Sequence, residues 1–398
     1  MASLDDQPND HLTVIMRFLD GQSLKRCQRV SHRLARFAVI QWPETCALHT
    51  ARLRNIETVV GDHLLFDRYP SIKACMVPGV TEILMGDVNV TDQEVCVMLT
   101  KCGPELLQLE FRHRRMRTPF QSLMNACKRL EVLKIRAYNC CFDEHGMIGV
   151  PIGASLKHLE FSSQPINDDT MLPLATSSPN LETLRLIENS DTITDRSLIP
   201  IFRGCRKLKS VSLTAYKGVT DLAYLQLAKS CPELVKLFAP IGDLLDPNNV
   251  LEHLGRGCPL LDQLNLSVGS RHSTRVVHPT PLTTHFPNLI VLILRWTGRT
   301  IDDELVRGLS QGCPKLERLL IPYSIVTDEA LPSLLSLPLK YLGLSSTDVT
   351  ERALEILGGL PSLVYLDLLG VELSPRACRM FRQLHPGVQL VSDDDTIV

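Results

Sequence analysis

Leu106-x-x-Leu109-x-Phe111 is the first clear copy of a hydrophobic pattern that recurs along this 398-residue chain and indicates its architecture. The pattern returns every 23 to 28 residues, and its later copies begin at Leu130, Leu156, Leu181, Leu208, Leu234, Leu261, Leu289, Leu316, Leu339 and Leu363. Self-similarity at this period is typical of a solenoid, in which each repeat buries its apolar side chains against its neighbours. The pattern therefore predicts an elongated protein that presents a binding surface.

The segment from Cys313 to Ala330 indicates the order of elements within one copy. Leu316-x-x-Leu319-x-Ile321 alternates with a period of two, as expected of a short parallel strand. Pro314 ends the preceding helix because it lacks an N–H and has a fixed backbone angle. Val326-Thr327-Asp328 indicates a hydrophobic staple and an N-cap, which begin the next helix, and Ile193-Thr194-Asp195 and Val219-Thr220-Asp221 predict the same. The repeat predicts a curved α/β stack with parallel strands on the concave face and helices on the convex face.

Five of the 13 cysteines lie three residues before the first leucine of a copy: Cys127, Cys205, Cys231, Cys258 and Cys313. A residue in register with the repeat has a structural role, so we expect a small apolar plug at the end of each repeat helix. Reduced cysteines favour a cytoplasmic or nuclear location. No Cys-x-x-Cys pair occurs, and no zinc site is expected.

The recurring Cys-Pro-x-Leu-x-x-Leu-x-Leu, with a later Ile-Thr-Asp, resembles the cysteine-containing subfamily of leucine-rich repeats. The resemblance covers residues 77–390 and implies a solenoid of about twelve repeats. A degenerate first copy is visible at Val80-x-x-Ile83-x-Met85, and a fading last copy begins near Val388. Terminal copies are expected to be atypical because one side lacks a neighbouring repeat.

The first 50 residues follow a different pattern, with apolar residues at helical spacing on either side of Asp20-Gly21. Two short amphipathic helices of this size have little core of their own, so a partner or the solenoid must cover their apolar face. The order Pro-x-Asp-x-Leu, Ile, Phe-Leu-Asp, Ser-Leu, Cys and Val-Ser resembles an F-box. In that family the motif binds the Skp-type adaptor of a cullin/RING ubiquitin ligase.

The resemblance implies adaptor contacts at Pro8, Leu12, Ile15, Phe18, Leu19, Leu24, Cys27 and Val30. The chain departs from the F-box pattern at Gln7, where an apolar residue usually stands, and at Leu34, where tryptophan is common. An alternative is that residues 1–50 simply cap the first repeat. Residues 51–76 are expected to form a linker and a cap on the first repeat, and residues 391–398 an acidic tail. The ending Thr396-x-Val398 resembles a PDZ-domain ligand, although a disordered acidic tail explains it equally well.

Residues that flank the strand leucines are expected to project from the concave face. The candidate contacts for a target protein are Arg112, Arg136, Arg185, Phe238, Ile293, Arg295, Leu320, Tyr341 and Tyr365. The early repeats have a basic bias, whereas the later ones form an apolar and aromatic stripe, which is typical of a partner site. The alternative is that some of these side chains pack against their neighbours.

Two segments break the repeat and compete for the binding role. Residues 111–117 contain four arginines, which suit an acidic or phosphorylated ligand. Residues 269–285 are rich in histidine, arginine and proline, and they are expected to replace the usual capped helix. Either segment could equally be a tolerated surface insertion.

Composition and motifs argue against several classes of function. A formal net charge of −2 is unsuited to general nucleic-acid binding. No apolar run reaches the roughly 18 residues needed to cross a bilayer, and the start is acidic where a signal peptide would be basic. The sequence has no phosphate-binding glycine loop, nucleophile elbow or metal-spaced cluster, so we expect neither catalysis nor a cofactor.

The leading hypothesis is the substrate-recognition adaptor of an SCF-type ubiquitin ligase, which promotes ubiquitination and proteasomal degradation of an unidentified target protein. It follows from the F-box resemblance joined directly to the repeats. The alternative is an interaction scaffold that never meets a ligase. A receptor gated by a small molecule, of the plant-hormone type, would need a basic pocket, and the short array makes this third hypothesis weaker.

Overall fold

The computed structural model of the chain describes residues 82–85, 103–112, 126–136, 153–162, 166–187, 193–214, 218–241, 246–268, 278–296 and 301–393. The chain divides into two compact units, residues 1–180 and 181–398. The helices expected in the first 50 residues and the acidic end beyond residue 393 lie outside the described residues. The boundaries expected at residues 50, 76 and 390 therefore stay predictions.

The described part of the first unit is built on parallel strands, each taken from one copy of the repeat. They are β1 (Glu82–Met85), β2 (Gln108–Arg112), β3 (Val132–Arg136) and β4 (His158–Ser162). The strands pair in register, with Leu109 opposite Leu133 and Leu133 opposite Leu159. Strand β1 confirms the degenerate first copy. The short helices are η3 (Gly103–Glu105), α8 (Asp168–Met171) and α9 (Leu174–Ser177).

The second unit continues the same pattern with parallel strands that pair in sequence order. They are β5 (Thr183–Ile187), β6 (Ser210–Leu213), β7 (Lys236–Ile241), β8 (Gln263–Val268), β9 (Val291–Trp296), β10 (Arg318–Leu320), β11 (Tyr341–Gly343), β12 (Tyr365–Asp367) and β13 (Gln389–Val391). The last of them confirms the copy expected near Val388. Because every strand is parallel to the next, each connection must cross from one end of the sheet to the other.

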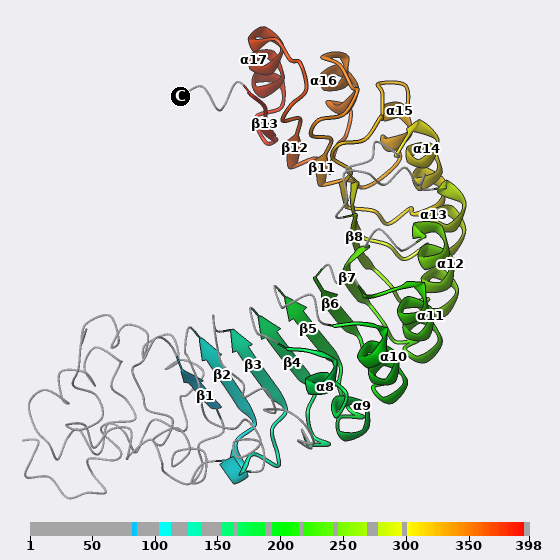
Figure 1. The fold of residues 1–398 in the computed structure, drawn as a ribbon. Coiled ribbons are helices and arrows are strands. Elements are labelled where there is room, and N and C mark those ends of the chain that lie inside the picture. Colours follow the sequence, from blue (N-terminus) through cyan, green and yellow to red (C-terminus); the bar gives the residue numbers. More distant parts are fainter. Residues whose placement is uncertain are drawn as a thin grey trace, which may run out of the picture. The chain divides into compact units, whose positions relative to one another are not determined.

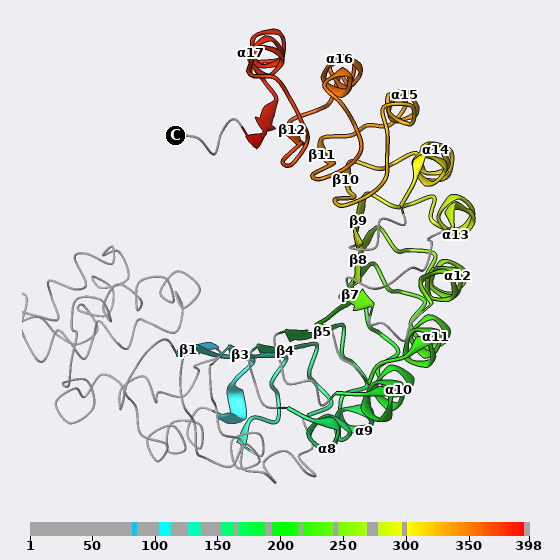
Figure 2. The ribbon, with the colours of Figure 1, turned by 45° about the horizontal axis from the view of Figure 1, so that its top comes forward.

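Helices of the second unit make those crossings. They are α10 (Asp195–Gly204), α11 (Asp221–Ser230), α12 (Pro247–Gly257), α13 (Pro279–His285), α14 (Asp303–Gly312), α15 (Leu331–Leu334), α16 (Arg352–Leu357) and α17 (Pro375–Leu384). Figures 1 and 2 show these helices as an outer row and the strands as an inner row. Within this unit, the predicted strands on a concave face and helices on a convex face are confirmed.

The core lies between the two rows and is made by the repeated leucines. Every first leucine of a copy, from Leu106 to Leu363, has at most 7% of its surface exposed. Full burial of one such side chain contributes about 1.5–3 kcal/mol relative to exposure. The core therefore grows by one layer with each copy.

Buried cysteines stand in a column at the C-terminal ends of four helices of the second unit. Cys205, Cys231, Cys258 and Cys313 are the C-cap residues of α10, α11, α12 and α14, and each donates its backbone N–H to the carbonyl four residues earlier. The thiol of Cys231 donates to the carbonyl oxygen of Cys205, and that of Cys258 to the carbonyl oxygen of Cys231, both at 3.6 Å. The predicted plugs are confirmed, and burial raises the pKa of each of these four thiols to about 12.

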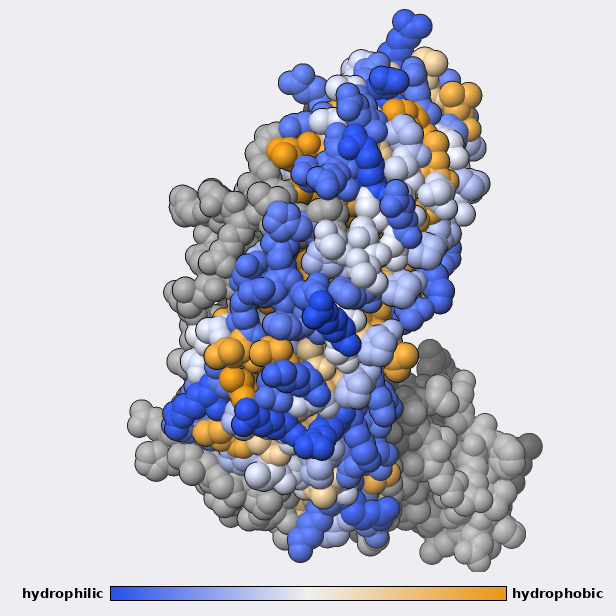
Figure 3. Space-filling view, turned by 90° about the vertical axis from the view of Figure 1, so that its right-hand side faces the viewer, coloured by the Kyte–Doolittle hydropathy of each residue, from blue (hydrophilic) through white to orange (hydrophobic). Residues whose placement is uncertain are grey.

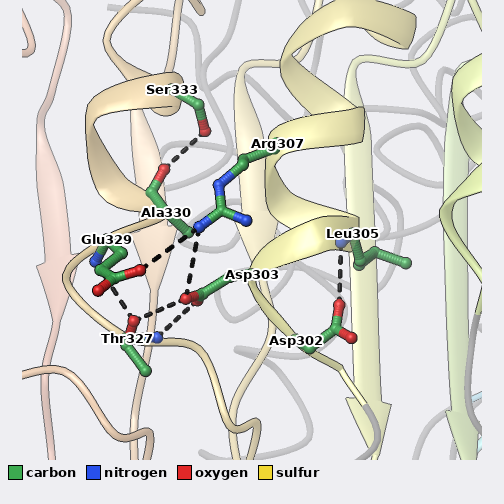
Figure 4. Close-up of polar contacts among 8 residues, drawn as sticks. All are labelled: Asp302, Asp303, Leu305, Arg307, Thr327, Glu329, Ala330 and Ser333. Atoms are coloured by element: carbon green, nitrogen blue, oxygen red, sulfur yellow. Dashed lines mark hydrogen bonds and ion pairs between the residues drawn. The ribbon is translucent and has the colours of Figure 1, made fainter.

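Acidic side chains link the start of one helical segment to the start of the next. The carboxylate of Asp303 accepts the backbone N–H of Thr327 at 2.8 Å and its hydroxyl at 2.7 Å, as Figure 4 shows. Asp195 binds Thr220 in the same way, and Asp328 binds Thr350. We call this series the acid–threonine ladder. It satisfies an N–H that the start of a helix leaves without an intrahelical partner.

The threonines of the acid–threonine ladder include those predicted as N-caps. Thr194 and Thr220 are N-caps whose hydroxyls accept the N–H two residues later, which confirms the prediction for α10 and α11. Thr327 accepts the N–H of Glu329 in the same manner, but α15 begins only at Leu331. Pro332 stands in the first turn of that helix, where its missing N–H costs nothing.

The structure corrects the expectation that residues 269–285 replace the repeat helix. Helix α13 occupies Pro279–His285 and lies beside α12 and α14. Its N-cap, His278, makes no side-chain capping bond, but Pro279 is held in the first turn. The sequence reasoning looked for a threonine cap and missed the proline start.

The outer side of the molecule is mostly hydrophilic. Figure 3 shows hydrophobic spots there that are separated by hydrophilic residues. Leu222 of α11 is an exposed apolar residue, with 59% of its surface accessible to solvent. Among the described helices, none is both long enough and apolar enough to cross a bilayer.

We predict that Asp303→Ala lowers the free energy of unfolding by about 1–3 kcal/mol, because the N–H of Thr327 loses its acceptor in a partly buried position. Urea titration of the full chain would measure the change, and hydrogen exchange at Thr327 would locate it. The matched control is Glu304→Ala in the same helical turn, which loses only the helix-dipole contribution of about 0.3–1 kcal/mol. Equal effects of the two substitutions would show that the acid–threonine ladder adds nothing.

We also predict that Cys205, Cys231, Cys258 and Cys313 resist alkylation by iodoacetamide at pH 8 in the native protein. Raising the pKa from 9.0 to about 12 lowers the thiolate population about a thousandfold, and burial further blocks the reagent. Peptide mapping by mass spectrometry would report each site, with the protein in denaturant as the control. Native labelling as fast as in denaturant would contradict the plugged helix ends.

Candidate functional site on the strand face

Most of the candidate contacts lie on the exposed face of the strands, where side chains alternate with the buried leucines. Arg136 is in β3, Arg185 in β5, Phe238 in β7, and Ile293 and Arg295 in β9, while Leu320, Tyr341 and Tyr365 are in β10, β11 and β12. Arg112 belongs to β2, but its side chain lies outside the described part of the structure. The eight residues implied as adaptor contacts, from Pro8 to Val30, also lie outside it.

In the first unit, Arg136 is held between two buried carboxylates. Its guanidinium donates to Glu160 from Nε at 2.5 Å and from Nη2 at 3.0 Å, and to Glu110 from Nη1 at 3.3 Å. Glu110 and Glu160 are only 5% and 3% exposed. The hydrogen bond with Glu160 raises the pKa of Arg136, against the opposing effect of burial.

This arrangement changes the meaning of the basic bias expected for the early repeats. Glu110, Lys134 and Glu160 stand opposite one another on β2, β3 and β4, so positive and negative side chains alternate across the strands. Arg136 uses its donors within the protein and stabilises the sheet. Sequence reasoning counted the arginines but could not pair them, because the partners are 24 and 26 residues away.

In the second unit, the middle strands present fewer apolar contacts than expected. Ile293 is only 9% exposed and lies between Asn265 and Leu320 in register. It therefore acts mainly as support for its neighbours. Phe238 is partly exposed, and Arg295 is exposed.

The last strands bring an arginine and two tyrosines into one row. Arg318, Tyr341 and Tyr365 are paired in register on β10, β11 and β12. The guanidinium carbon of Arg318 lies 4.1 Å from the centre of the Tyr341 ring. The centres of the Tyr341 and Tyr365 rings are 6.3 Å apart at an angle of 38°. Both distances are within the range of favourable cation–π and aromatic contacts.

A second row lies two residues further along the same strands. Leu320 extends over Gly343, where an added Cβ would be 2.7 Å from the leucine Cδ2. Asp367 follows in register, and its carboxylate accepts the hydroxyl of Ser345 at 2.7 Å and the N–H of Leu369 at 3.0 Å. Because glycine at position 343 has no side chain, the end of Leu320 occupies the space where a Cβ would stand.

A turn beyond the strand ends adds exposed apolar side chains, of which Tyr323 was not predicted from the sequence. Tyr323 has a φ of 59° and is 53% exposed, while Leu369, just after β12, is 40% exposed. Ser346 and Gly370 have positive φ at the equivalent positions of the next two repeats. Left-handed backbone costs a bulky residue of order 1–3 kcal/mol, so the surrounding structure must hold Tyr323 in place. The bond from its N–H to the carbonyl oxygen of Ser345, at 2.9 Å, does so.

We call the set Arg318, Leu320, Tyr323, Tyr341, Tyr365 and Leu369 the tyrosine–arginine surface. The sequence offers one weak indication that Tyr323 lies in a left-handed turn, which is the glycine at the equivalent position 370. Within the described ranges, no three His, Cys, Asp or Glu side chains come close enough to hold a metal ion. The arrangement is suited to binding another molecule by stacking, apolar contact and charge.

Comparisons with known proteins agree with this architecture. No known protein-family model matches the chain. Two curated plant proteins are similar in sequence. The Coronatine-insensitive protein homolog 2 of Oryza sativa subsp. japonica is 25% identical over 243 residues, which are 57% of this chain and 37% of the relative. The BTB/POZ domain-containing protein FBL11 of Arabidopsis thaliana is 26% identical over 305 residues, which are 73% of this chain and 29% of the relative. The chain thus spans well under half the length of either relative.

Two solved structures resemble the fold. An internalin from Listeria monocytogenes has a TM-score of 0.53 and 17% identity, and the match covers 85% of this chain and 87% of that one. A chain from the yeast Rad7 and Elc1 complex has a TM-score of 0.52 and 18% identity, with 96% and 100% covered. The fold defines a leucine-rich-repeat protein. At 25% and 26% identity, the two plant relatives are similar to this chain over part of their length.

We predict that Arg136→Met lowers the free energy of unfolding by about 1–3 kcal/mol, because two buried carboxylates lose their shared donor. Thermal unfolding of the full chain would measure the loss. Adding Glu110→Gln and Glu160→Gln removes the two buried negative charges that have lost this donor and should recover part of the stability. If the triple variant is no more stable than Arg136→Met, the pairing is not the cause.

Proposed function

We propose that this protein is the substrate-recognition subunit of an SCF-type ubiquitin ligase. In this proposal the F-box-like residues 1–50 bind a Skp-type adaptor, and through it the cullin/RING core. The exposed strand face binds the target protein. The observation that carries the proposal is the joining, in one chain, of the F-box-like order to a leucine-rich-repeat stack with an exposed arginine and tyrosine face.

The mechanism would be positional and need no reactive group on this chain. A target held on the strand face shares one assembly with charged ubiquitin, so its lysines experience a high effective concentration of the reactive thioester. The repeats suit this role because each is fixed to its neighbours by the leucine core and the acid–threonine ladder. Ubiquitination would then lead to proteasomal degradation of the target.

Two features of the surroundings follow from the same proposal. A ligase subunit of this kind would act in the cytoplasm or the nucleus, where the buried cysteines stay reduced. A PDZ domain that adds a strand to the end of the chain, at Thr396 to Val398, would be an additional partner.

We predict that changing Leu12, Ile15 and Phe18 together to Ala abolishes co-purification of the Skp-type adaptor and the cullin. These side chains are on the apolar face that the F-box resemblance assigns to the adaptor. Affinity purification with quantitative mass spectrometry would measure the loss. A matched control changes three exposed apolar residues of the second unit to Ala, namely Leu222, Leu260 and Leu384, and should keep the adaptor.

Adaptor recovery equal to that of the unaltered protein would refute the ligase assignment. The chain would then be an interaction scaffold, and blocking the proteasome would not change the abundance of the proteins that it binds. Circular dichroism of both triple variants separates lost binding from lost folding.

A further inference from the structure

We infer that the tyrosine–arginine surface binds an acidic segment of the target protein, with a carboxylate on Arg318 and an apolar side chain against Leu320 and Tyr365. The inference rests on the proposed function and names the class of substrate that this face would recognise. It is carried by the contrast between two arginines, by the balance of charge and by the exposed aromatic side chains.

Arg318 is prepared for an external anion, whereas Arg136 is not. Arg136 already donates to two carboxylates. Among the described residues, the contact recorded for the guanidinium of Arg318 is the face of Tyr341, at 4.1 Å. This cation–π contact involves the ring face and uses none of the guanidinium N–H groups as hydrogen-bond donors to a carboxylate, so that two of them can match a carboxylate with parallel hydrogen bonds.

The charge around Arg318 favours a negative ligand. On β9 to β12, the charged side chains that project from the exposed face are those of Arg295, Arg318 and Asp367. Asp367 already accepts hydrogen bonds from Ser345 and from the N–H of Leu369. Arg295 is exposed and makes no ion pair with a described residue. The balance of two positive charges and one satisfied negative charge attracts an acidic segment.

The apolar part of the surface favours a ligand that has an apolar side chain next to its carboxylate. Tyr341 and Tyr365 are partly exposed beside Leu320, and Tyr323 and Leu369 are exposed beyond the strand ends. Tyrosine and arginine are the side chains that most often dominate the energy of a protein interface. The left-handed backbone at Tyr323 is an additional cost, of the kind found at binding sites. An acidic residue next to an aliphatic or aromatic one fits both parts.

The surface is poorly suited to nucleic acid. Phosphate backbones are bound by stripes of many arginines and lysines, whereas the described residues of β9 to β12 present two arginines on this face and the chain has a net charge of −2. A protein carboxylate needs only one well-placed guanidinium. The proposal therefore commits to a protein segment.

The test begins with a phage-displayed library of random dodecapeptides selected on the immobilised full chain. We expect the selected peptides to be enriched in Asp or Glu next to Leu, Ile, Phe or Tyr. One enriched peptide is then synthesised with its acid unchanged, with the acid replaced by its amide, and with phosphoserine in its place. Isothermal titration calorimetry gives the affinity of each for the full chain.

Arg318→Gln and Tyr365→Ala should each weaken the acidic peptide about tenfold or more, as expected for the loss of a charge-assisted hydrogen bond or an aromatic anchor. Arg379→Gln on the exposed side of α17 is the matched control and should leave affinity unchanged. Thermal unfolding confirms that each variant is folded. The amide peptide should bind Arg318→Gln and the unaltered chain equally.

Three outcomes would overturn the inference: no acidic enrichment, equal binding by Arg318→Gln, or binding by the phosphoserine peptide but not by the carboxylate peptide. These outcomes do not test adaptor binding, because the adaptor is absent from the peptide selection. If acidic peptides bind through Arg318 but the adaptor does not co-purify, the inference about the surface is correct and the ligase proposal is wrong. If the adaptor co-purifies but the chain does not prefer acidic peptides, the ligase proposal stands and the inference about the surface is wrong.

Discussion

Each repeat buries its leucines only against the repeats beside it, and this constraint governs the rest of the structure. A parallel strand every two dozen residues brings equivalent side chains into rows, so a residue type repeated in sequence becomes a column in space. The thiol column and the acid–threonine ladder are two such columns, one inside the helix ends and one at the helix starts. The exposed strand face is a third, in which the residues differ from row to row.

The fold was largely predictable because its signal is periodic. The leucines gave every strand from β2 to β12, and the weaker copies gave β1 and β13. The cysteines were predicted as plugs because they keep register with Leu208, Leu234 and Leu261. What could not be predicted were contacts that join one repeat to the next at side-chain level. Asp303 looks like an ordinary first-turn acid, and only the neighbouring Thr327 shows that it also binds one repeat ahead.

The sequence predicted which side chains project from the strand face, but it predicted less well which of them are available for binding. Alternation along a strand correctly assigned Leu320, Tyr341 and Tyr365 to the exposed side, because successive side chains of a strand point to opposite faces. It could not reveal that Glu110 and Glu160 engage Arg136, that Ile293 is covered, or that Tyr323 projects from a left-handed turn. Pairing, shielding and backbone conformation depend on neighbours that are distant in sequence. The adaptor-binding residues remain assigned by resemblance.

Gly343 gives this face an unusual capacity for change. It stands between Leu320 and Asp367 in the second row, and the atom nearest to a new Cβ would be the mobile end of the leucine, 2.7 Å away, while the Leu320 Cα is 3.7 Å away. A larger residue there would swing one side chain aside and spare the main chain. A single codon could thus reshape the tyrosine–arginine surface, while the scaffold that displays it stays intact.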